Sequence, residues 1–301
     1  MGETIAVIGL GKMGKNVALN MLSRGYTVIA SNRSPEPVDE LKQSGAIPAY
    51  TFEDSVKLLP VPRKVWIMVP PGAVDEVVSR IKPHLQAGDI IIEAGNSNYK
   101  ESARRHRELS ESGIHFLDAG CSGGPSGARD GMCMMVGGDE NVFRLVEPIL
   151  RNLSVPDGVA YVGPAGSGHF VKMVHNAIEY GMMQSIGEGF ELLEKGPYEL
   201  DMREIAYLWN RGSVVRSYLV ELVERALSKD PKLEAIEGYV EDTGEGRWAI
   251  QAAIERDVPF TGLSHALFAR FRSRKNSFSD KILAALRNEF GGHAVKEKKS
   301  G

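Results

Sequence analysis

Short apolar runs alternate with amphipathic segments along the first half of the chain. The run TIAVI ends at Gly9, and a short apolar run bounded by glycine is typical of a buried parallel strand. The apolar runs predict strands at Thr4–Ile8, Tyr26–Ala30, Lys64–Val69, Asp89–Glu93, His115–Leu117 and Met132–Val136. Helical spacing of apolar residues predicts helices at Gly14–Ser23, Val38–Gln43, Val74–Ile81, Lys100–Ser110 and Asn141–Leu150. Strands that alternate with helices indicate a parallel, doubly wound sheet.

The pattern changes at the glycine-rich segment Gly163–Gly168. Beyond it no strand pattern occurs; Phe170–Glu194 has the pattern of one long helix, and further helical patterns extend to Phe290. The sequence therefore predicts an α/β Rossmann-type doubly wound sheet over residues 1–165, followed by an all-α C-terminal domain over residues 166–301.

Composition excludes several classes of protein. The 301 residues include 36 Lys and Arg against 39 Asp and Glu, a net charge of −3, which argues against binding to nucleic acid. No apolar run reaches the roughly 18 residues of a membrane span, and the N-terminus has no basic signal-peptide region. Cys121 and Cys133 are too few for a disulfide framework and lack metal-site spacing, and we expect both to be small buried apolar residues. We expect a cytoplasmic protein with reduced thiols and no metal.

The segment Gly9–Gly14 has the pattern GxGxxG, directly after a predicted strand and at the start of a predicted helix. The first glycine allows the tight turn, Gly11 allows the backbone to approach a pyrophosphate, and Gly14 allows the helix to pack on the strand. The start of the helix then faces the phosphate charge. In this context the pattern predicts a dinucleotide-binding loop, and the alternative is a purely structural glycine turn. The predicted loop residues are Gly9, Leu10, Gly11, Lys12, Met13 and Gly14.

The end of the second predicted strand bears on the choice of cofactor. NAD enzymes usually place an acid there, whereas this chain reads Ser31-Asn32-Arg33-Ser34, with no acid before Glu36. The guanidinium of Arg33 can pair with a 2′-phosphate, so NADP is favoured over NAD. The alternative is that Arg33 is a solvated loop residue that stacks on adenine.

Four polar residues recur at helical spacing in the segment KMVHNAIEY. Lys172, His175, Asn176 and Glu179 stand at i, i+3, i+4 and i+7, which share one face of a helix. Their neighbours are apolar, so we expect buried surroundings and a stripe that faces a cleft; the alternative is a solvated helix face. A lysine and a glutamate in a closed site suit acid–base chemistry.

These motifs together resemble 6-phosphogluconate dehydrogenase, a decarboxylating member of the β-hydroxyacid dehydrogenases. The resemblance extends from Ile5 to His293. It rests on six segments: IAVIGLGKMGKN, GNSN, SGGPSGARDG, KMVHNAIEY, FAR and RNEFGGH. KMVHNAIEY discriminates best, because the related 3-hydroxyisobutyrate enzymes typically lack the HN…E set.

The resemblance implies a role for each matching residue. Lys172 is then the general base at the C3 hydroxyl of 6-phosphogluconate, and Glu179 is the acid that protonates C1 of the enediol that remains after CO2 has left. The residues implied to bind substrate are Asn96, Ser122, Gly123, Gly124, His175, Asn176, Tyr180, Arg270, Arg287 and His293. Besides the glycine loop, the residues expected to bind the cofactor are Asn32, Arg33, Ser34, Met68, Val69, Pro70 and Asn96.

The C-terminal segment RNEFGGH implies self-association. In the family such a segment reaches into the neighbouring subunit's site, where Arg287 and His293 would contact the substrate. The alternative is a helix that ends at its glycines. One departure concerns the segment KGTGKW of longer members, where this chain has Thr243 in place of the lysine and Arg247 as a potential substitute.

Three hypotheses follow. The first is an NADP-dependent 6-phosphogluconate dehydrogenase of the pentose phosphate pathway in its short, bacterial-type form, although some short forms use NAD. The second is another β-hydroxyacid dehydrogenase, resembling the 3-hydroxyisobutyrate enzymes. The third is a non-catalytic NADPH-binding homologue. Lys172 and Glu179 argue against the third, and Arg270 and Arg287 argue against a small acid without phosphate.

Overall fold

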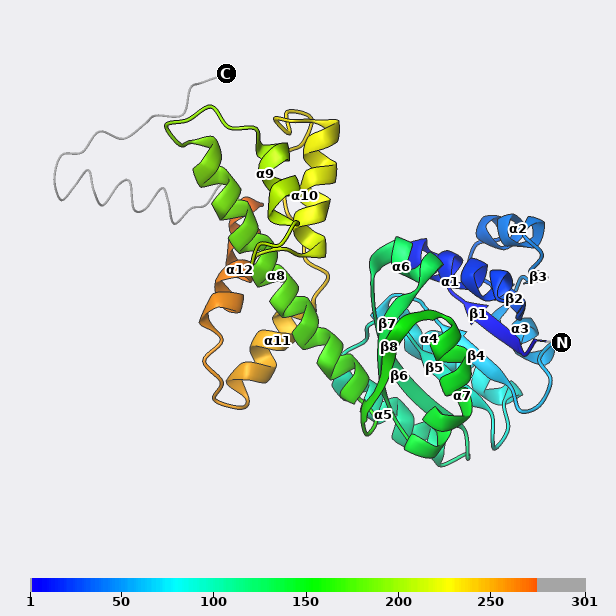
Figure 1. Ribbon diagram of the computed structural model, residues 1–301. Coiled ribbons are helices and arrows are strands. Elements are labelled where there is room, and N and C mark those ends of the chain that lie inside the picture. Colours follow the sequence, from blue (N-terminus) through cyan, green and yellow to red (C-terminus); the bar gives the residue numbers. More distant parts are fainter. Residues whose placement is uncertain (1, 275–301) are drawn as a thin grey trace, which may run out of the picture. The chain divides into compact units, whose positions relative to one another are not determined.

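The computed structural model describes residues 2–274, which divide into two compact units, one up to His175 and the other from Asn176 onward (Figure 1). The first unit contains one sheet of eight strands in the order β3-β2-β1-β4-β5-β6-β7-β8. The strands are β1 (Thr4–Ile8), β2 (Thr27–Ser31), β3 (Ile47–Ala49), β4 (Lys64–Ile67), β5 (Ile90–Glu93), β6 (His115–Ser122), β7 (Met132–Gly137) and β8 (Ser154–Gly163). The predicted Rossmann-type doubly wound fold is confirmed.

Neighbouring strands are parallel except for β6 and β7, which are antiparallel. The chain winds outward from β1 through β2 to β3 and then returns to β4 beside β1. The strand order thus reverses between β1 and β4, the position at which such sheets bind ligands beyond the carboxyl ends of their strands. The loops after β1, β4 and β5 all start at this edge.

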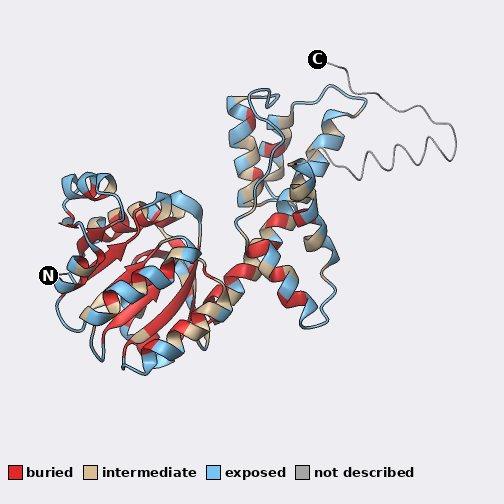
Figure 2. Cartoon of the chain, turned by 180° about the vertical axis from the view of Figure 1, so that it is seen from behind, coloured by how far each residue is buried: buried red, intermediate tan, exposed pale blue. Residues whose placement is uncertain are grey.

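Helices cover both faces of the sheet. They are α1 (Lys12–Ser23), α2 (Glu36–Gln43), α3 (Phe52–Lys57), α4 (Val74–Ile81), α5 (Tyr99–Ser110), α6 (Gly124–Asp130) and α7 (Glu140–Asn152), with short 3-10 turns at Pro71–Ala73 and Lys82–His84. Strand β1 shows how the core divides: Ile5 and Val7 pack with α1, α2 and α7, whereas Ala6 and Ile8 pack with α3, α4 and α5. Figure 2 shows the strands buried and the outer helix faces exposed.

Helix α8 (Ser167–Glu194) follows the sheet, and every later element of the described chain is helical. These are α9 (Met202–Trp209), α10 (Tyr218–Lys229), α11 (Glu245–Ile254) and α12 (Thr261–Ser273). The all-α C-terminal region is therefore confirmed. The compact units divide within α8, and the predicted domain boundary at residues 165/166 stays a prediction. No helix among the described residues is long and apolar enough to cross a membrane.

Four elements were not predicted from the sequence: β3, α3, α6 and β8. Strand β3 has three residues, and β8 contains Pro156 and Gly158, which are typical of turns. Helix α6 lies in SGGPSGARDG, where glycine and proline hide the helical pattern. The strand predicted at His115–Leu117 continues to Ser122 as β6, because Asp118 and Gly120 are buried there.

Asp242 organises the segment between α10 and α11 of the second unit. Its carboxylate, 3% exposed, accepts hydrogen bonds from the guanidinium of Arg247 at 2.9 and 3.0 Å and pairs with that of Arg274 at 2.9 Å. The hydrogen bond from Arg247, followed by that from Arg274, lowers the pKa of Asp242 from 3.8 to about 2. Since the folded pKa is depressed, the stabilisation exists above pH 3.8 and is lost as the pH falls toward 2.

We expect Asp242→Asn to lower the stability of the protein at pH 7 by at most about 2 kcal/mol, because one pKa unit corresponds to about 1.4 kcal/mol. Thermal unfolding of both proteins between pH 7 and pH 3 measures this. The difference in melting temperature should shrink below about pH 4. A constant difference over the whole range would show that Asp242 does not act through its charge.

Candidate active site

The glycine loop has the geometry of a dinucleotide cradle. Gly9 has φ +97°, and a Cβ there would lie 2.4 Å from the carbonyl oxygen of Met68. A Cβ on Gly14 would lie 1.8 Å from the carbonyl oxygen of Gly9, so helix and loop touch. Around Gly11, by contrast, no described atom lies within 4 Å of a Cβ position, and no side chain caps α1 there. The open space at Gly11 and the N-terminus of helix α1 together fit a bound pyrophosphate.

The loop after β2 is tied to this cradle. The backbone N–H of Leu10 donates to Oδ1 of Asn32 at 3.0 Å, and Nδ2 of Asn32 donates to Oγ of Ser34 at 3.1 Å. Asn32 therefore holds the two loops together, while Arg33 and Ser34 are exposed beside it. Lys12 is also exposed, and Met13 is half-buried.

The loops after β4 and β5 run against each other. Met68, Val69 and Pro70 follow β4, and a Cβ on Gly95 would lie 2.4 Å from the carbonyl oxygen of Val69. Oδ1 of Asn96 is buried and has no hydrogen-bond partner among the described residues. A buried acceptor without a partner is uncommon, so this amide fits a residue that contacts a ligand.

The start of α8 is fixed on strand β6. The carboxylate of Asp118, fully buried, accepts the backbone N–H of Gly166 at 2.7 Å and that of His169 at 2.8 Å. One turn further, Lys172 is 6% exposed, and a Cβ on Gly120 would lie 2.4 Å from the Cβ of Lys172. Only a glycine at position 120 leaves room for the lysine stem.

Three predicted site residues are in contact in the first unit. Nζ of Lys172 lies 3.4 Å from Nδ1 of His175, and Nε2 of His175 lies 3.1 Å from Oγ of Ser122. Ser122 ends β6, and Gly123 and Gly124 follow it with φ of +125° and +62°. The glycines permit this turn because they have no Cβ. The chain Ser122–His175–Lys172 can orient a substrate hydroxyl and move its proton.

A second group of predicted residues belongs to the second unit. Nδ2 of Asn176 donates to Oε1 of Glu245 at 3.2 Å, and Oε2 of Glu245 accepts from the hydroxyl of Thr243. The Thr243 hydroxyl lies 3.5 Å from that of Tyr180. The guanidinium carbon of Arg270 stands 3.5 Å from the centre of the Tyr180 ring. Asn176 and Tyr180 are thus linked through Glu245 and Thr243 of the segment that replaces KGTGKW, and Arg270 stacks on Tyr180.

Arg247 is engaged elsewhere, since its guanidinium pairs with Asp242 and stands 4.4 Å from the ring centre of Phe271. It does not reach toward the position of the missing family lysine at Thr243. Glu179, half-buried, stands seven residues after Lys172 in the uninterrupted helix α8. Arg287 and His293 lie outside the described residues.

Two expectations about burial need correction. Val171 and Ile178, expected to be buried beside the polar stripe, are 36% and 48% exposed; at i and i+7 they share a helix face that this chain leaves exposed. Cys133, expected to be buried like Cys121, is exposed, because β7 turns its side chain away from the core. Burial raises the pKa of the Cys121 thiol to about 12, which agrees with a small apolar role.

Sequence reasoning missed four buried polar residues that support these groups: Glu93, Asp118, His169 and Glu245. Each contacts residues remote in the sequence, so periodicity gives no signal for them. A weak signal existed for Glu93, since an acid at the end of the apolar run IIIE directly precedes the GNSN segment.

The fold and these residues define a dehydrogenase of the type that binds a nicotinamide dinucleotide. Residues 4–163 match the family model for the NAD binding domain of 6-phosphogluconate dehydrogenase, and residues 168–300 match that for its C-terminal domain. The chain belongs to the 6-phosphogluconate dehydrogenase family.

Three proteins similar to this chain carry names that agree with this family. YqeC of Bacillus subtilis, a suggested 6-phosphogluconate dehydrogenase, is 48% identical over 98% of this chain and 99% of its own length. An NAD(+)-dependent, decarboxylating 6-phosphogluconate dehydrogenase of Haloferax volcanii is 41% identical over 98% of this chain and 99% of its own length. The Plasmodium falciparum enzyme superimposes with a TM-score of 0.83 at 33% identity and covers all of this chain, which spans 67% of that enzyme.

The second and third glycines of the loop, Gly11 and Gly14, offer a matched test of the cradle. We expect Gly11→Ala to leave the melting temperature unchanged, because its Cβ points into open space, but to weaken nicotinamide dinucleotide binding at least about tenfold, because the methyl stands where the pyrophosphate approaches. Gly14→Ala should lower the melting temperature, since its Cβ would overlap the carbonyl of Gly9. Thermal unfolding and fluorescence titration with reduced nucleotide measure both. Unchanged binding by Gly11→Ala would place the pyrophosphate elsewhere.

Proposed function

We propose that the protein catalyses the oxidative decarboxylation of 6-phosphogluconate to ribulose 5-phosphate and CO2 with reduction of NADP, as in the pentose phosphate pathway and gluconate metabolism. The observation that carries the proposal is the buried Lys172, in contact with His175, which in turn contacts Ser122. Membership of the 6-phosphogluconate dehydrogenase family supports it.

In the proposed reaction Lys172 takes the proton from the C3 hydroxyl of the substrate. The bound nicotinamide dinucleotide supplies the hydride acceptor, which leaves a 3-keto acid on the substrate. Protonated Lys172 then donates a hydrogen bond to the new carbonyl oxygen, which accepts the electrons of the C1–C2 bond as the carboxylate carbon leaves as CO2. Glu179 protonates the former C2, which is C1 of the resulting enediol. After the hydride has left, every electron pair moves within the substrate, so the chain's own groups need only move protons.

The remaining residues bind and orient the substrate. Ser122, Gly123 and Gly124 hold its carboxylate, because glycine backbone N–H groups can approach closely. His175 and Asn176 bond its hydroxyls, Asn96 lies between it and the nicotinamide, and Tyr180 with Arg270 holds the phosphate. The residues expected to line the cofactor are Gly9, Leu10, Gly11, Lys12, Met13, Gly14, Asn32, Arg33, Ser34, Met68, Val69 and Pro70.

We further propose that the protein is a cytoplasmic homo-oligomer in which the C-terminal segment of one subunit completes its neighbour's site through Arg287 and His293. The exposed apolar face of α8 at Val171 and Ile178 supports self-association, since exposed apolar surface is a usual feature of subunit interfaces. The predicted domains, 1–165 for NADP and 166–301 for substrate and dimerisation, fit this arrangement.

The second candidate is an NAD-dependent enzyme. It is favoured by the NAD(+) dependence of the Haloferax relative, which matches this chain over nearly its full length. NADP is favoured by the exposed guanidinium of Arg33 and by the lack of an acid at residues 31–34, where a carboxylate would repel the 2′-phosphate. A 3-hydroxyisobutyrate-type activity is the alternative for the substrate.

The purified protein should reduce NADP faster than NAD with 6-phosphogluconate, measured by absorbance of the reduced nicotinamide, and should not act on 3-hydroxyisobutyrate. Arg33→Ala should raise KM for NADP about tenfold or more and leave KM for NAD nearly unchanged, because only NADP carries the phosphate. Arg24→Ala, an exposed arginine at the end of α1, is the control. No reduction of either cofactor overturns the proposal, and faster reduction of NAD overturns the role of Arg33.

Lys172→Met should lower kcat by about 10³-fold or more while both ligands still bind, because methionine fills the space but accepts no proton. Steady-state turnover and nucleotide titration separate the two effects. Turnover within about tenfold of the parent would mean that another group is the base.

A further inference from the structure

Strand β5 ends at Glu93, whose side chain is completely buried, directly before the loop that carries Asn96. Oε1 of Glu93 accepts the backbone N–H of Gly95 at 2.8 Å. Asn96 has φ +58°, a conformation that residues with a side chain seldom adopt. The bond from Gly95 fixes the backbone immediately before this turn, and the same glycine packs against the carbonyl of Val69. The direction of the Asn96 side chain thus depends on the Glu93 carboxylate.

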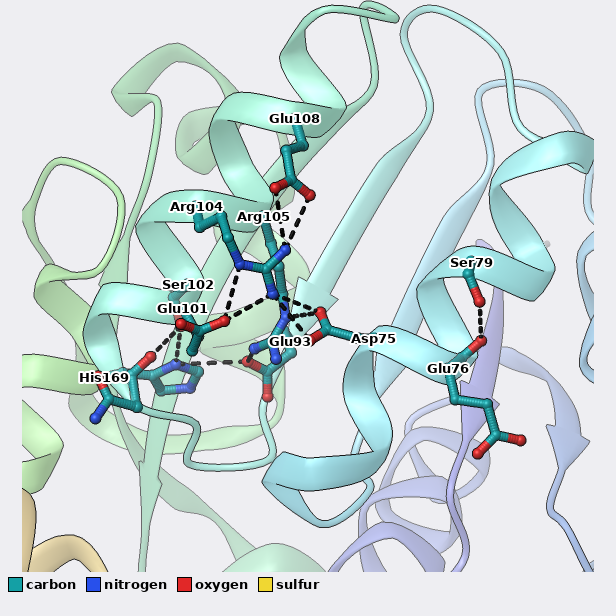
Figure 3. A network of polar contacts seen from close by, with 11 residues as sticks. Asp75, Glu76, Ser79, Glu93, Glu101, Ser102, Arg104, Arg105, Glu108 and His169 are labelled. Atoms are coloured by element: carbon teal, nitrogen blue, oxygen red, sulfur yellow. Dashed lines mark hydrogen bonds and ion pairs between the residues drawn. The ribbon is translucent and has the colours of Figure 1, made fainter.

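The other carboxylate oxygen of Glu93, Oε2, faces the side chains of Arg105 and His169 (Figure 3). Nη1 of Arg105, a residue 4% exposed, lies 3.8 Å from Oε2 of Glu93, and Nδ1 of His169 lies 3.5 Å from the same oxygen. Nε of Arg105 donates to Asp75 at 2.7 Å, so a carboxylate nearer the surface orients the guanidinium. A buried carboxylate needs such neighbours to remain in place.

His169 joins this group to the helix of the proposed base. Its Nδ1 is 2.7 Å from Oγ of Ser102 on α5, and its backbone N–H donates to Asp118 on β6. His169 stands one helical turn before Lys172 in α8. One buried network therefore links the Asn96 loop to the start of α8.

We propose that Glu93 is a positioning residue of the active site: its carboxylate, held by Arg105 and His169, fixes Gly95 and so aims the Asn96 amide at the bound nucleotide and substrate. The kinetic part of this inference rests on the proposed function. The part that concerns nucleotide binding does not, because Asn96 lies at the carboxyl edge of the sheet where the dinucleotide cradle opens.

The chain contains a matched control at the opposite end of the same strand. Asp89, directly before β5, is also completely buried, accepts the backbone N–H groups of Arg63 and Gln86, and pairs with the Arg63 guanidinium at 3.1 Å. Asp89 and Glu93 are thus alike in burial and in having an arginine partner. They differ in that only Glu93 touches the Asn96 loop.

The test compares Glu93→Gln with Asp89→Asn in the full-length protein. An amide has one acceptor oxygen, so the substituted side chain cannot accept from Gly95 and face Arg105 with an oxygen at the same time. We expect Glu93→Gln to lower kcat/KM for 6-phosphogluconate, and the affinity for reduced nucleotide, at least about tenfold. Asp89→Asn should change neither by more than about twofold, even where both variants lose thermal stability. If the parent does not oxidise 6-phosphogluconate, the proposed function fails and nucleotide binding alone decides the role of Glu93.

A double-mutant cycle with Asn96→Gly shows whether Glu93 acts through Asn96; glycine is chosen because it tolerates the positive φ. Glu93→Gln should have no further effect once the amide is gone. Equal effects of Glu93→Gln and Asp89→Asn, or full additivity with Asn96→Gly, overturn the proposal. If Glu93→Gln does not fold, Glu93→Asp replaces it, because the shorter carboxylate keeps its charge beside Arg105 but draws back from Gly95.

Discussion

The contact between Asp118 and the start of helix α8 holds Lys172 and His175 in place next to strand β6. The backbone N–H groups of Gly166, directly before the helix, and of His169, in its first turn, both donate to this one buried carboxylate, and hydrogen bonds to a charged group contribute about 1.5–3 kcal/mol each. The contact is possible only because glycines remove the side chains between the elements: a Cβ on Gly168 would lie 2.3 Å from the carbonyl oxygen of Asp118. Lys172 therefore rests on β6 with its stem against Gly120, and its amine is delivered to His175.

Periodicity predicts the parts of the fold whose pattern is local. The central strands are short apolar runs, and helices α1, α4, α5 and α7 present one apolar face, so their positions follow from the sequence within a few residues. Strand β8 could not be predicted, because its sequence SVPDGVAYVG has turn residues and it exists through pairing with β7. The extension of β6 through Asp118 likewise depends on a helix more than 40 residues later.

The candidate site divides in the same way. Lys172, His175, Asn176 and Glu179 are recognisable because one helix sets their spacing, and Gly9, Gly11 and Gly14 because a phosphate-binding turn does. Glu93 and His169 have no such local cause. They are buried polar residues whose neighbours come from other elements: Ser102 on α5 bonds His169, and His169 on α8 lies 3.5 Å from Glu93. Only the folded chain brings them together.

The replacement of the family lysine by Thr243 changes the charge around Tyr180. In the described part of the chain, Arg270 is the cation stacked on Tyr180, Arg247 is committed to Asp242, and Glu245 adds a carboxylate that Asn176 and Thr243 bind. A phosphate dianion bound beside Tyr180 would face that carboxylate as well as Arg270, so it needs a further positive charge. The loss of the lysine thus gives more weight to the phosphate contact proposed above for Arg287. Under the proposed function, self-association and phosphate recognition form a single requirement, because the proposed contribution of Arg287 from the neighbouring subunit would supply the charge that residue 243 lacks.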